Sequence, residues 1–241
     1  MAIAFVQKSA QLFADNATTI SPSLAGTTAG NLVVMLVNCV DAGVASPPPA
    51  LSPPAGWLDA VSEVGPVGGD AFKPVTAIFY KENIAGGVES GTVNLPASSY
   101  AMATIVEFSG VSTSSSLDVV DSASFIGVTA GDSGTTAATA IADSVAIAVG
   151  CPQVGGGAAT TGLSTPAAVG YTNLYAEVDG GGGHTVGSHD YKILSATGTQ
   201  VASWTWNESA YFSGSIAVFS GTVAPASTGN SFVPLIRRRR R

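Results

Sequence analysis

The most constraining feature of this chain is an internal repeat. Residues 79–110 align without a gap on residues 190–221, at an offset of 191 − 80 = 111. Each copy has a Tyr-Lys pair near its start and ends in Phe-Ser-Gly. Because self-similarity at a fixed period indicates that one structural unit is used twice, we expect the chain to contain two related halves.

A second pair of segments extends the repeat upstream. Residues 31–39, NLVVMLVNC, align with residues 143–151, DSVAIAVGC, at an offset of 151 − 39 = 112, which makes Cys39 and Cys151 equivalent. Two cysteines make no disulfide framework and cannot form a zinc site by themselves. We therefore expect two free thiols, buried at equivalent places in the core.

The strand pattern predicts an all-β fold. Helical periodicity is almost absent, whereas short β-rich runs such as VTAIFYKE and GSIAVFSGT alternate with turn residues. A half of about 110 residues is marginal for two packed layers. We therefore predict one jelly-roll-like β-sandwich with internal pseudo-two-fold duplication, in preference to two small sandwiches in tandem.

This prediction sets the domain boundaries. Residues 1–222 should form one domain, built from halves of about 1–122 and 123–222, and residues 223–241 should form a C-terminal extension. The Gly-, Ser- and Thr-rich stretch 123–140 is expected to be the joint, either a surface connection or an edge excursion.

Charge is scarce in the body and concentrated at the C-terminus. Only 10% of the residues are charged, which favours a neutral surface that meets neighbouring molecules. Four of the nine Lys and Arg lie outside the tail, so residues 1–236 carry 4 − 16 = −12. No apolar run is long enough for a membrane span and no signal peptide is evident, so we expect synthesis in a cytoplasm.

The tail itself suggests an electrostatic tether. A run of like charges must be solvated or paired with acidic groups. A cloning remnant, a nuclear import signal and a solvated end without a task are the alternatives, and nucleic acid is a weaker one because the domain is acidic. We predict an acidic protein partner, such as another copy of this chain, and a binding arm made of Val233, Pro234, Leu235, Ile236, Arg237, Arg238, Arg239, Arg240 and Arg241.

Residues that could carry chemistry are few. His184 and His189, with Asp179 and Asp190, could ligate a metal, but a His-x4-His pair in a glycine-rich loop lacks the rigid spacing of a helical pair. We expect instead a mobile loop with exposed imidazoles. No nucleotide-binding loop and no nucleophile elbow is present. The sequence therefore predicts no catalytic, cofactor-binding or metal site.

Aromatic residues offer one alternative function. Trp204 and Trp206 lie two apart in a predicted strand and so face the same side. We expect that side to be core, since Val93 and Leu95 occupy the matching positions in the first half. If the aromatics were exposed, Trp57, Tyr171 and Trp204 could stack on sugar rings, which would indicate a carbohydrate-binding module.

The order of motifs resembles a known group of proteins. An apolar strand after GN, a PPAGW turn, an FYK strand and MATIVEFSGV followed by LDV, with a second round of HDYK and SGSIAVFSG, is similar to β-sandwich accessory proteins encoded among the virion structural genes of tailed bacteriophages and in related bacterial loci. The similarity covers residues 25–222. It implies a jelly-roll-like sandwich that decorates the capsid or belongs to a tail or fibre, and it assigns no functional residues.

These observations lead to one functional expectation and one alternative. The first is a non-enzymatic virion protein, a capsid decoration or cement subunit that contacts other virion proteins or its own copies through the C-terminal arm. The alternative is a carbohydrate-binding module of a tail or fibre that binds surface glycans. Neither function needs a cofactor, nucleic acid or a membrane.

Overall fold

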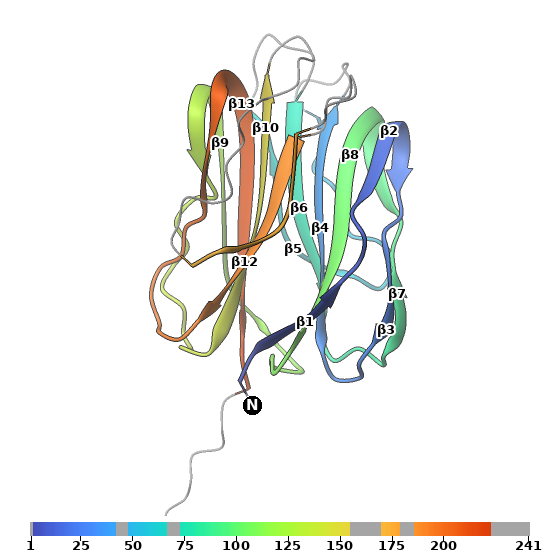
Figure 1. The fold of residues 1–241 in the computed structure, drawn as a ribbon, viewed down its shortest axis with the longest axis vertical. Helices are drawn as coiled ribbons and strands as arrows, with labels where there is room; N and C mark the ends of the chain where they lie inside the picture. The colour runs from blue at the N-terminus through green and yellow to red at the C-terminus, as the bar shows by residue number, and fades with distance from the viewer. Residues whose placement is uncertain (1, 42–47, 67–72, 155–169, 179–185, 223–241) are drawn as a thin grey trace, which may run out of the picture.

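The computed structural model describes residues 2–41, 48–66, 73–154, 170–178 and 186–222. Within these ranges the chain is all-β, without a helix, and its strands pair antiparallel in curled sheets (Figure 1). The strands are β1 (Ala4–Lys8), β2 (Leu12–Ile20), β3 (Ser23–Thr27), β4 (Leu32–Asp41), β5 (Leu58–Val64), β6 (Lys73–Lys81), β7 (Gly87–Ser90), β8 (Val93–Ser109), β9 (Leu117–Asp132), β10 (Ser144–Val154), β11 (Thr172–Val178), β12 (Val186–Leu194) and β13 (Ser203–Ser220).

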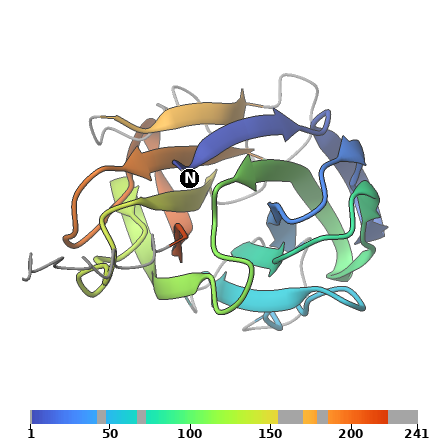
Figure 2. The same cartoon turned by 90° about the horizontal axis from the view of Figure 1, so that it is seen from below.

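Each half of the chain builds its own main sheet. The first has the order β1-β8-β4-β6-β5, with β2 also paired to β8, and β3 and β7 form a small separate ribbon. The second has the order β11-β12-β10-β13-β9. The four-strand order β8-β4-β6-β5 therefore recurs as β13-β10-β12-β11, and the view along the strands shows the halves side by side (Figure 2).

The strand register corrects one detail of the sequence alignment. Val34 lies opposite Tyr80, and Ile147 lies opposite Tyr191, so β4 and β10 correspond at an offset of 147 − 34 = 113 rather than 112. A slip of one residue places a side chain on the other face of a sheet. Both cysteines are free and buried as predicted, but their predicted equivalence is wrong, since the counterpart of Cys151 is Asn38.

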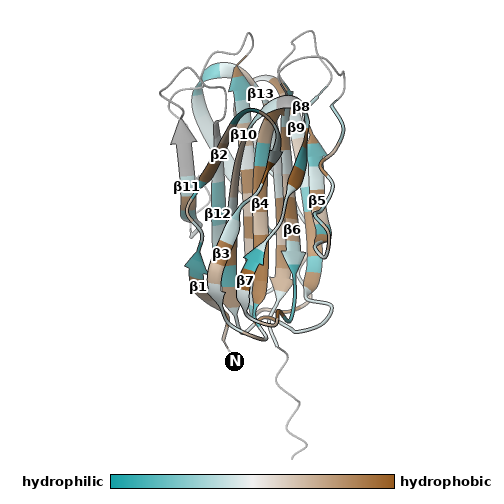
Figure 3. Ribbon diagram, turned by 90° about the vertical axis from the view of Figure 1, so that its right-hand side faces the viewer, coloured by the Kyte–Doolittle hydropathy of each residue, from teal (hydrophilic) through white to brown (hydrophobic). Residues whose placement is uncertain are grey.

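Apolar side chains form three clusters. One lies between the sheets and is shared by both halves, and each sheet has another on its outer face, which we call the private core of that half. The shared cluster joins alternate residues of β4, such as Val34, to residues of β10, such as Ile147. The other face of the first sheet packs with Phe79 and Trp57, and the other face of the second packs with Trp204. Figure 3 shows hydrophobic residues concentrated along β4 and its neighbours. Because both faces of these strands are buried, their sequences are apolar at nearly every position.

Polar contacts also join the halves at both edges. At one edge the Tyr175 hydroxyl donates to the Ser9 carbonyl at 2.9 Å, and the Lys8 ammonium lies 3.7 Å from the centre of the Tyr175 ring. At the other, the Ser122 hydroxyl donates to the Glu63 carboxylate at 2.8 Å. The two sheets are therefore held together by more than the apolar cluster between them.

The boundary between the halves differs from the predicted one. Strand β9 contains residue 122 and pairs along its length with β13, so the division falls between β8 and β9, at residues 110–116. Residues 123–132 form part of this edge strand and not a surface connection, because Phe125 and Val128 pack against the private core of the second half. The edge-excursion alternative describes these residues correctly.

In the private core of the second half, aromatic rings pack directly against the backbone of glycines. Trp204 is fully buried and Trp206 is 4% exposed, which confirms the core assignment. A Cβ on Gly150 would lie 2.8 Å from ring atoms of Trp204, so the ring needs the absence of a side chain there. The first half has Val37 and Val93 at the corresponding positions, which divides the same space between two aliphatic residues.

Candidate functional site

A buried carboxylate, Asp190 of β12, is the centre of a polar cluster in the second half. It accepts hydrogen bonds from the Ser188 hydroxyl at 2.6 Å, from the Asn173 amide at 2.8 Å and from the Trp204 indole N–H at 3.1 Å. Ser188 and Asp190 share one face of β12 because side chains alternate along a strand. The cluster lies within the private core of the second half.

Burial controls the chemistry of this carboxylate. It raises the pKa of Asp190 to about 6, against the lowering effect of the hydrogen bonds from Ser188, Asn173 and Trp204. Burial also raises the pKa of the Tyr171 hydroxyl, and the charge of Asp190 raises it further. Asp190 can therefore exchange a proton near neutral pH, while Tyr171 stays protonated.

The neighbouring residue His189 faces the other way, towards the first sheet. Its Nε2 lies 2.9 Å from Oδ1 of Asn38, and its side chain is fully buried. Burial lowers the pKa of His189 to about 3. The imidazole is therefore neutral at physiological pH and carries one N–H. Because the amide oxygen of Asn38 can only accept, this proton is assigned to Nε2, which donates to it.

The expectation of exposed imidazoles in a mobile loop is wrong for His189, which belongs to a buried strand. His184 and Asp179, the other members of the predicted metal alternative, lie outside the described residues. Within the described part of the chain, no group of three or more His, Cys, Asp or Glu side chains could hold a metal ion. His189 and Asp190 are on opposite faces of β12, so they do not act on one ligand.

Hydroxyl groups line the polar end of the interface between the sheets. The Thr76 hydroxyl lies 3.0 Å from that of Ser213 and 2.8 Å from that of Ser215. Close by, the Asn38 amide lies 3.8 Å from the Cys151 sulfur, and burial raises the pKa of that thiol to about 12. Cys151 is therefore a protonated, unreactive thiol.

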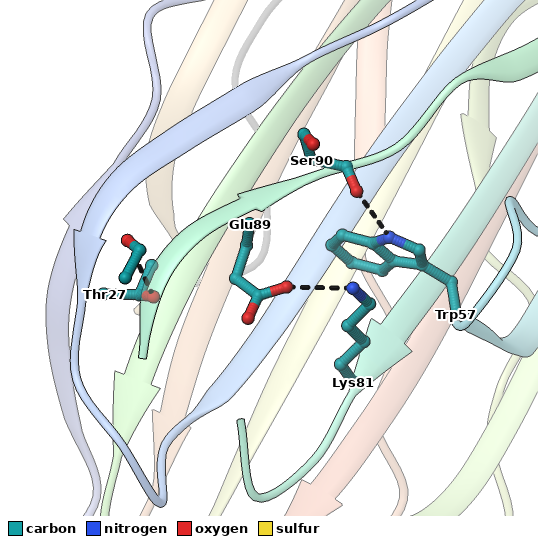
Figure 4. Close-up of polar contacts among 6 residues, drawn as sticks. Thr27, Trp57, Lys81, Glu89 and Ser90 are labelled. Atoms are coloured by element: carbon teal, nitrogen blue, oxygen red, sulfur yellow. Dashed lines mark hydrogen bonds and ion pairs between the residues drawn. The ribbon is translucent and has the colours of Figure 1, made fainter. Parts of the chain in front are cut away.

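Two equivalent contacts, one within each half, place a lysine over an aromatic ring. In the first, the Lys81 ammonium is 4.9 Å from the Trp57 ring centre and 2.9 Å from the Glu89 carboxylate, while the Trp57 indole donates to the Ser90 carbonyl at 3.0 Å (Figure 4). The same view shows the Thr27 hydroxyl, which donates to the Gly87 carbonyl. This arrangement fixes the β7 ribbon to the first sheet.

In the second half, Lys192 takes the place of Lys81 and Tyr171 that of Trp57. The Lys192 ammonium is 5.5 Å from the Tyr171 ring centre. The residue aligned with Glu89 is Gln200, at 200 − 89 = 111, so the second half has a neutral side chain at the position of this carboxylate. The predicted equivalence of Trp57 and Tyr171 therefore extends to the lysine that covers each ring.

These contacts count against sugar stacking at the predicted aromatics. Trp204 is fully buried, Trp57 is 5% exposed with Lys81 over its ring, and Tyr171 is partly buried with Lys192 over its ring. A sugar needs an open ring face. Trp57 and Trp204 are core residues of their own halves, and Tyr171 packs against the core of the second half beneath Lys192.

The predicted arm, residues 233–241, lies outside the described residues, but the point where it leaves the domain is well defined. Gly221 pairs with Val111 in an isolated bridge, and the Thr222 amide donates to the Gly110 carbonyl at 3.1 Å. The last strand, β13, thus ends at a fixed position beside the joint between the halves.

Sequence reasoning missed the Asp190 cluster, although a signal was available. In the alignment of the two copies, Asp190 stands opposite Phe79, which is fully buried in the first half. At this position the first half therefore has an apolar core residue, whereas the second half has a buried hydrogen-bond acceptor.

Comparisons with known proteins give no family assignment. No family model matches the chain, and no curated protein and no solved structure matches it. Among the described residues, no helix could cross a membrane.

Proposed function

We propose that this chain is a non-enzymatic structural protein of a phage virion, a capsid decoration or cement subunit whose C-terminal arm binds neighbouring proteins. As part of this proposal, the curled sheets belong to the jelly-roll-like β-sandwiches, with the two halves related by a pseudo-two-fold axis. The proposal rests on the resemblance of residues 25–222 to accessory virion proteins and on the charge distribution.

The observation that carries the proposal is the separation of charge between body and arm. Residues 1–236 carry 4 − 16 = −12, whereas residues 237–241 carry five positive charges. The described chain ends at Thr222, whose amide donates to the Gly110 carbonyl, on a body whose halves are joined at both edges. A rigid body with a basic arm suits attachment to an acidic protein surface.

The carbohydrate-binding alternative has less support. Of its candidate aromatics, Trp57 and Trp204 are core residues of the two halves, and Tyr171 packs against the core of the second. A glycan array with the isolated protein tests this alternative, and selective binding that is lost in Trp57→Ala or Tyr171→Ala variants would favour it over the structural role.

The proposal is tested by incorporation into particles. Deletion of residues 232–241 should leave the melting temperature nearly unchanged, because the three apolar clusters lie within residues 1–222, and should abolish incorporation. Replacement of Arg237–Arg241 by serine should weaken incorporation and make it less dependent on salt. Incorporation that is unaffected by both changes would show that the arm takes no part in docking.

A further inference from the structure

A shallow hollow of about 350 Å³ lies at the point where the chain leaves the domain. We call it the exit hollow. It lies between the turn that precedes β9 and the turn that precedes β10, and it is lined by Ser115, Leu117, Asp118, Ile141, Ser220 and Gly221. Its size is at the lower end of the range of sites that bury a ligand.

The exit hollow combines apolar and acidic groups. Leu117 and Ile141 provide the apolar surface, and Asp118 is part of the lining. A Cβ on Gly221 would lie 3.3 Å from Oδ2 of Asp143, so a second carboxylate borders the hollow. The Glu82 carboxylate is a third, since it accepts the amide of the lining residue Ser115 at 3.0 Å.

These carboxylates have no cation nearby. Within the described residues, none of the three forms an ion pair. The sequence between residues 117 and 222 contains a single Lys or Arg, Lys192. Glu82 and Asp118 accept hydrogen bonds from backbone amides, but no lysine or arginine of the described residues is ion-paired with them, so the hollow presents negative charge beside an apolar surface.

The C-terminal arm has the complementary composition. Val233, Pro234, Leu235 and Ile236 are apolar, and five arginines follow them. We propose that the exit hollow binds residues 233–241 of the same chain. The apolar residues of the arm lie against Leu117 and Ile141, and the arginines lie beside the surrounding carboxylates.

Chain length favours the same molecule over a second copy. Val233 follows Thr222 by 233 − 222 = 11 residues, a segment that reaches at most about 36–40 Å. The hollow is lined by Ser220 and Gly221, directly before the chain leaves the domain, so the arm has only to turn back. A short tether gives an effective concentration in the millimolar range, above that of a second copy in dilute solution.

The inference deepens the proposed function and rests on it in one respect, the treatment of residues 233–241 as a binding arm. In the isolated protein the arm occupies its own body. In a particle the same arginines exchange this weak site for the acidic surface of a neighbour.

Disulfide trapping tests the contact in the full chain. Ser112→Cys places a thiol on the rim of the hollow, and Phe232→Cys places one directly before the arm. The native Cys39 and Cys151 are fully buried and do not compete. The matched control has the same two cysteines with Arg237–Arg241 replaced by serine, so that linker length and thiol exposure are identical.

At low salt we expect an intramolecular disulfide that forms at least about fivefold faster with the arginines than with the serines. Asp118→Asn with Asp143→Asn, or high salt, should reduce the rate to that of the serine control. Equal rates with arginine and serine would overturn the proposal, and covalent dimers would overturn it in favour of a second copy. Because no particle is involved, failure here is distinct from failure of the incorporation test.

Discussion

The two halves share one strand order but fill their private cores in different ways. The first half has the aliphatic residues Val37 and Val93 at the two positions that Gly150 and Trp204 occupy in the second, and both belong to one cluster with Phe79. The second places Trp204 over Gly150 and binds the indole N–H with Asp190. The interface between the halves uses the same faces of the corresponding strands in both. The comparison teaches that the shared surface is constrained by both copies, whereas each outer core can change as long as its volume is filled.

The largest effect should come from exchanging side-chain volume between positions 204 and 150. Trp204→Val should lower the free energy of unfolding by about 3 kcal/mol, because it opens a cavity over Gly150. Gly150→Val should also destabilise, since the new Cβ would lie 2.8 Å from the ring. The double variant restores the valine pair of the first half, so it should be more stable than the sum of the single effects by about 1–2 kcal/mol. Denaturant unfolding measures all three variants, and strict additivity would show that the halves do not fill equivalent space.

Asp190 should make the stability of the protein depend on pH. Its folded pKa of about 6 lies above the ordinary value of 3.8, so between these values the folded state binds more protons and stability rises as pH falls. Asp190→Asn removes this gain. Relative to the wild type, the variant should lose about 2 kcal/mol of stability between pH 6.5 and pH 4.5. A difference between variant and wild type that is constant with pH would contradict the raised pKa.

His189 should have the opposite effect. Its folded pKa of about 3 lies below the ordinary histidine value of 6.5, so the unfolded state binds more protons between these values and stability falls as pH falls. His189→Gln keeps a donor for Asn38 and removes the titration. Between pH 6.5 and pH 4.5 the variant should gain about 2–3 kcal/mol relative to the wild type. In the wild type the two neighbours nearly cancel, and urea unfolding at several pH values separates them.

The smallest effect should come from the ion pair that only the first half has. Lys81 and Glu89 are partly exposed, at 26% and 11% of their side-chain surfaces. Glu89→Gln makes this site resemble that of Lys192 and Gln200 and should cost less than about 1 kcal/mol, with the cost reduced by salt. Thermal unfolding at two salt concentrations measures it, and a large, salt-independent loss would mean that Glu89 holds the β7 ribbon by other contacts.

Much of this architecture followed from the repeat, and the failures have physical causes. The Tyr-Lys and Phe-Ser-Gly motifs placed β6 with β12 and β8 with β13 correctly, because those strands carry the most distinctive residues. The alignment of β4 with β10 slipped by one residue, because a run of Val, Leu, Ile and Ala that is buried on both faces carries no alternation to fix the register.

Two other features were less clear from the sequence. Strand β9 is polar and glycine-containing, so its composition did not decide between a surface connection and an edge excursion, and pairing with β13 makes it an edge strand. His189 and Asp190 follow a glycine-rich segment and were expected at the surface, but strand pairing buries both side chains. The Asp190 site depends on Asn173 and Trp204, which lie 17 and 14 residues away along the chain, and no local pattern brings these together.

The central structural claim is that two related sheets depend on one shared interface. Expression of residues 1–113 and 114–241 as separate chains, cut in the exposed turn between β8 and β9, tests it most directly. Each piece alone would expose its side of the shared cluster, so neither should unfold cooperatively, whereas the mixed pieces should regain a cooperative transition. A soluble monomer of either piece with its own cooperative unfolding transition would contradict the account and show two independent domains in tandem.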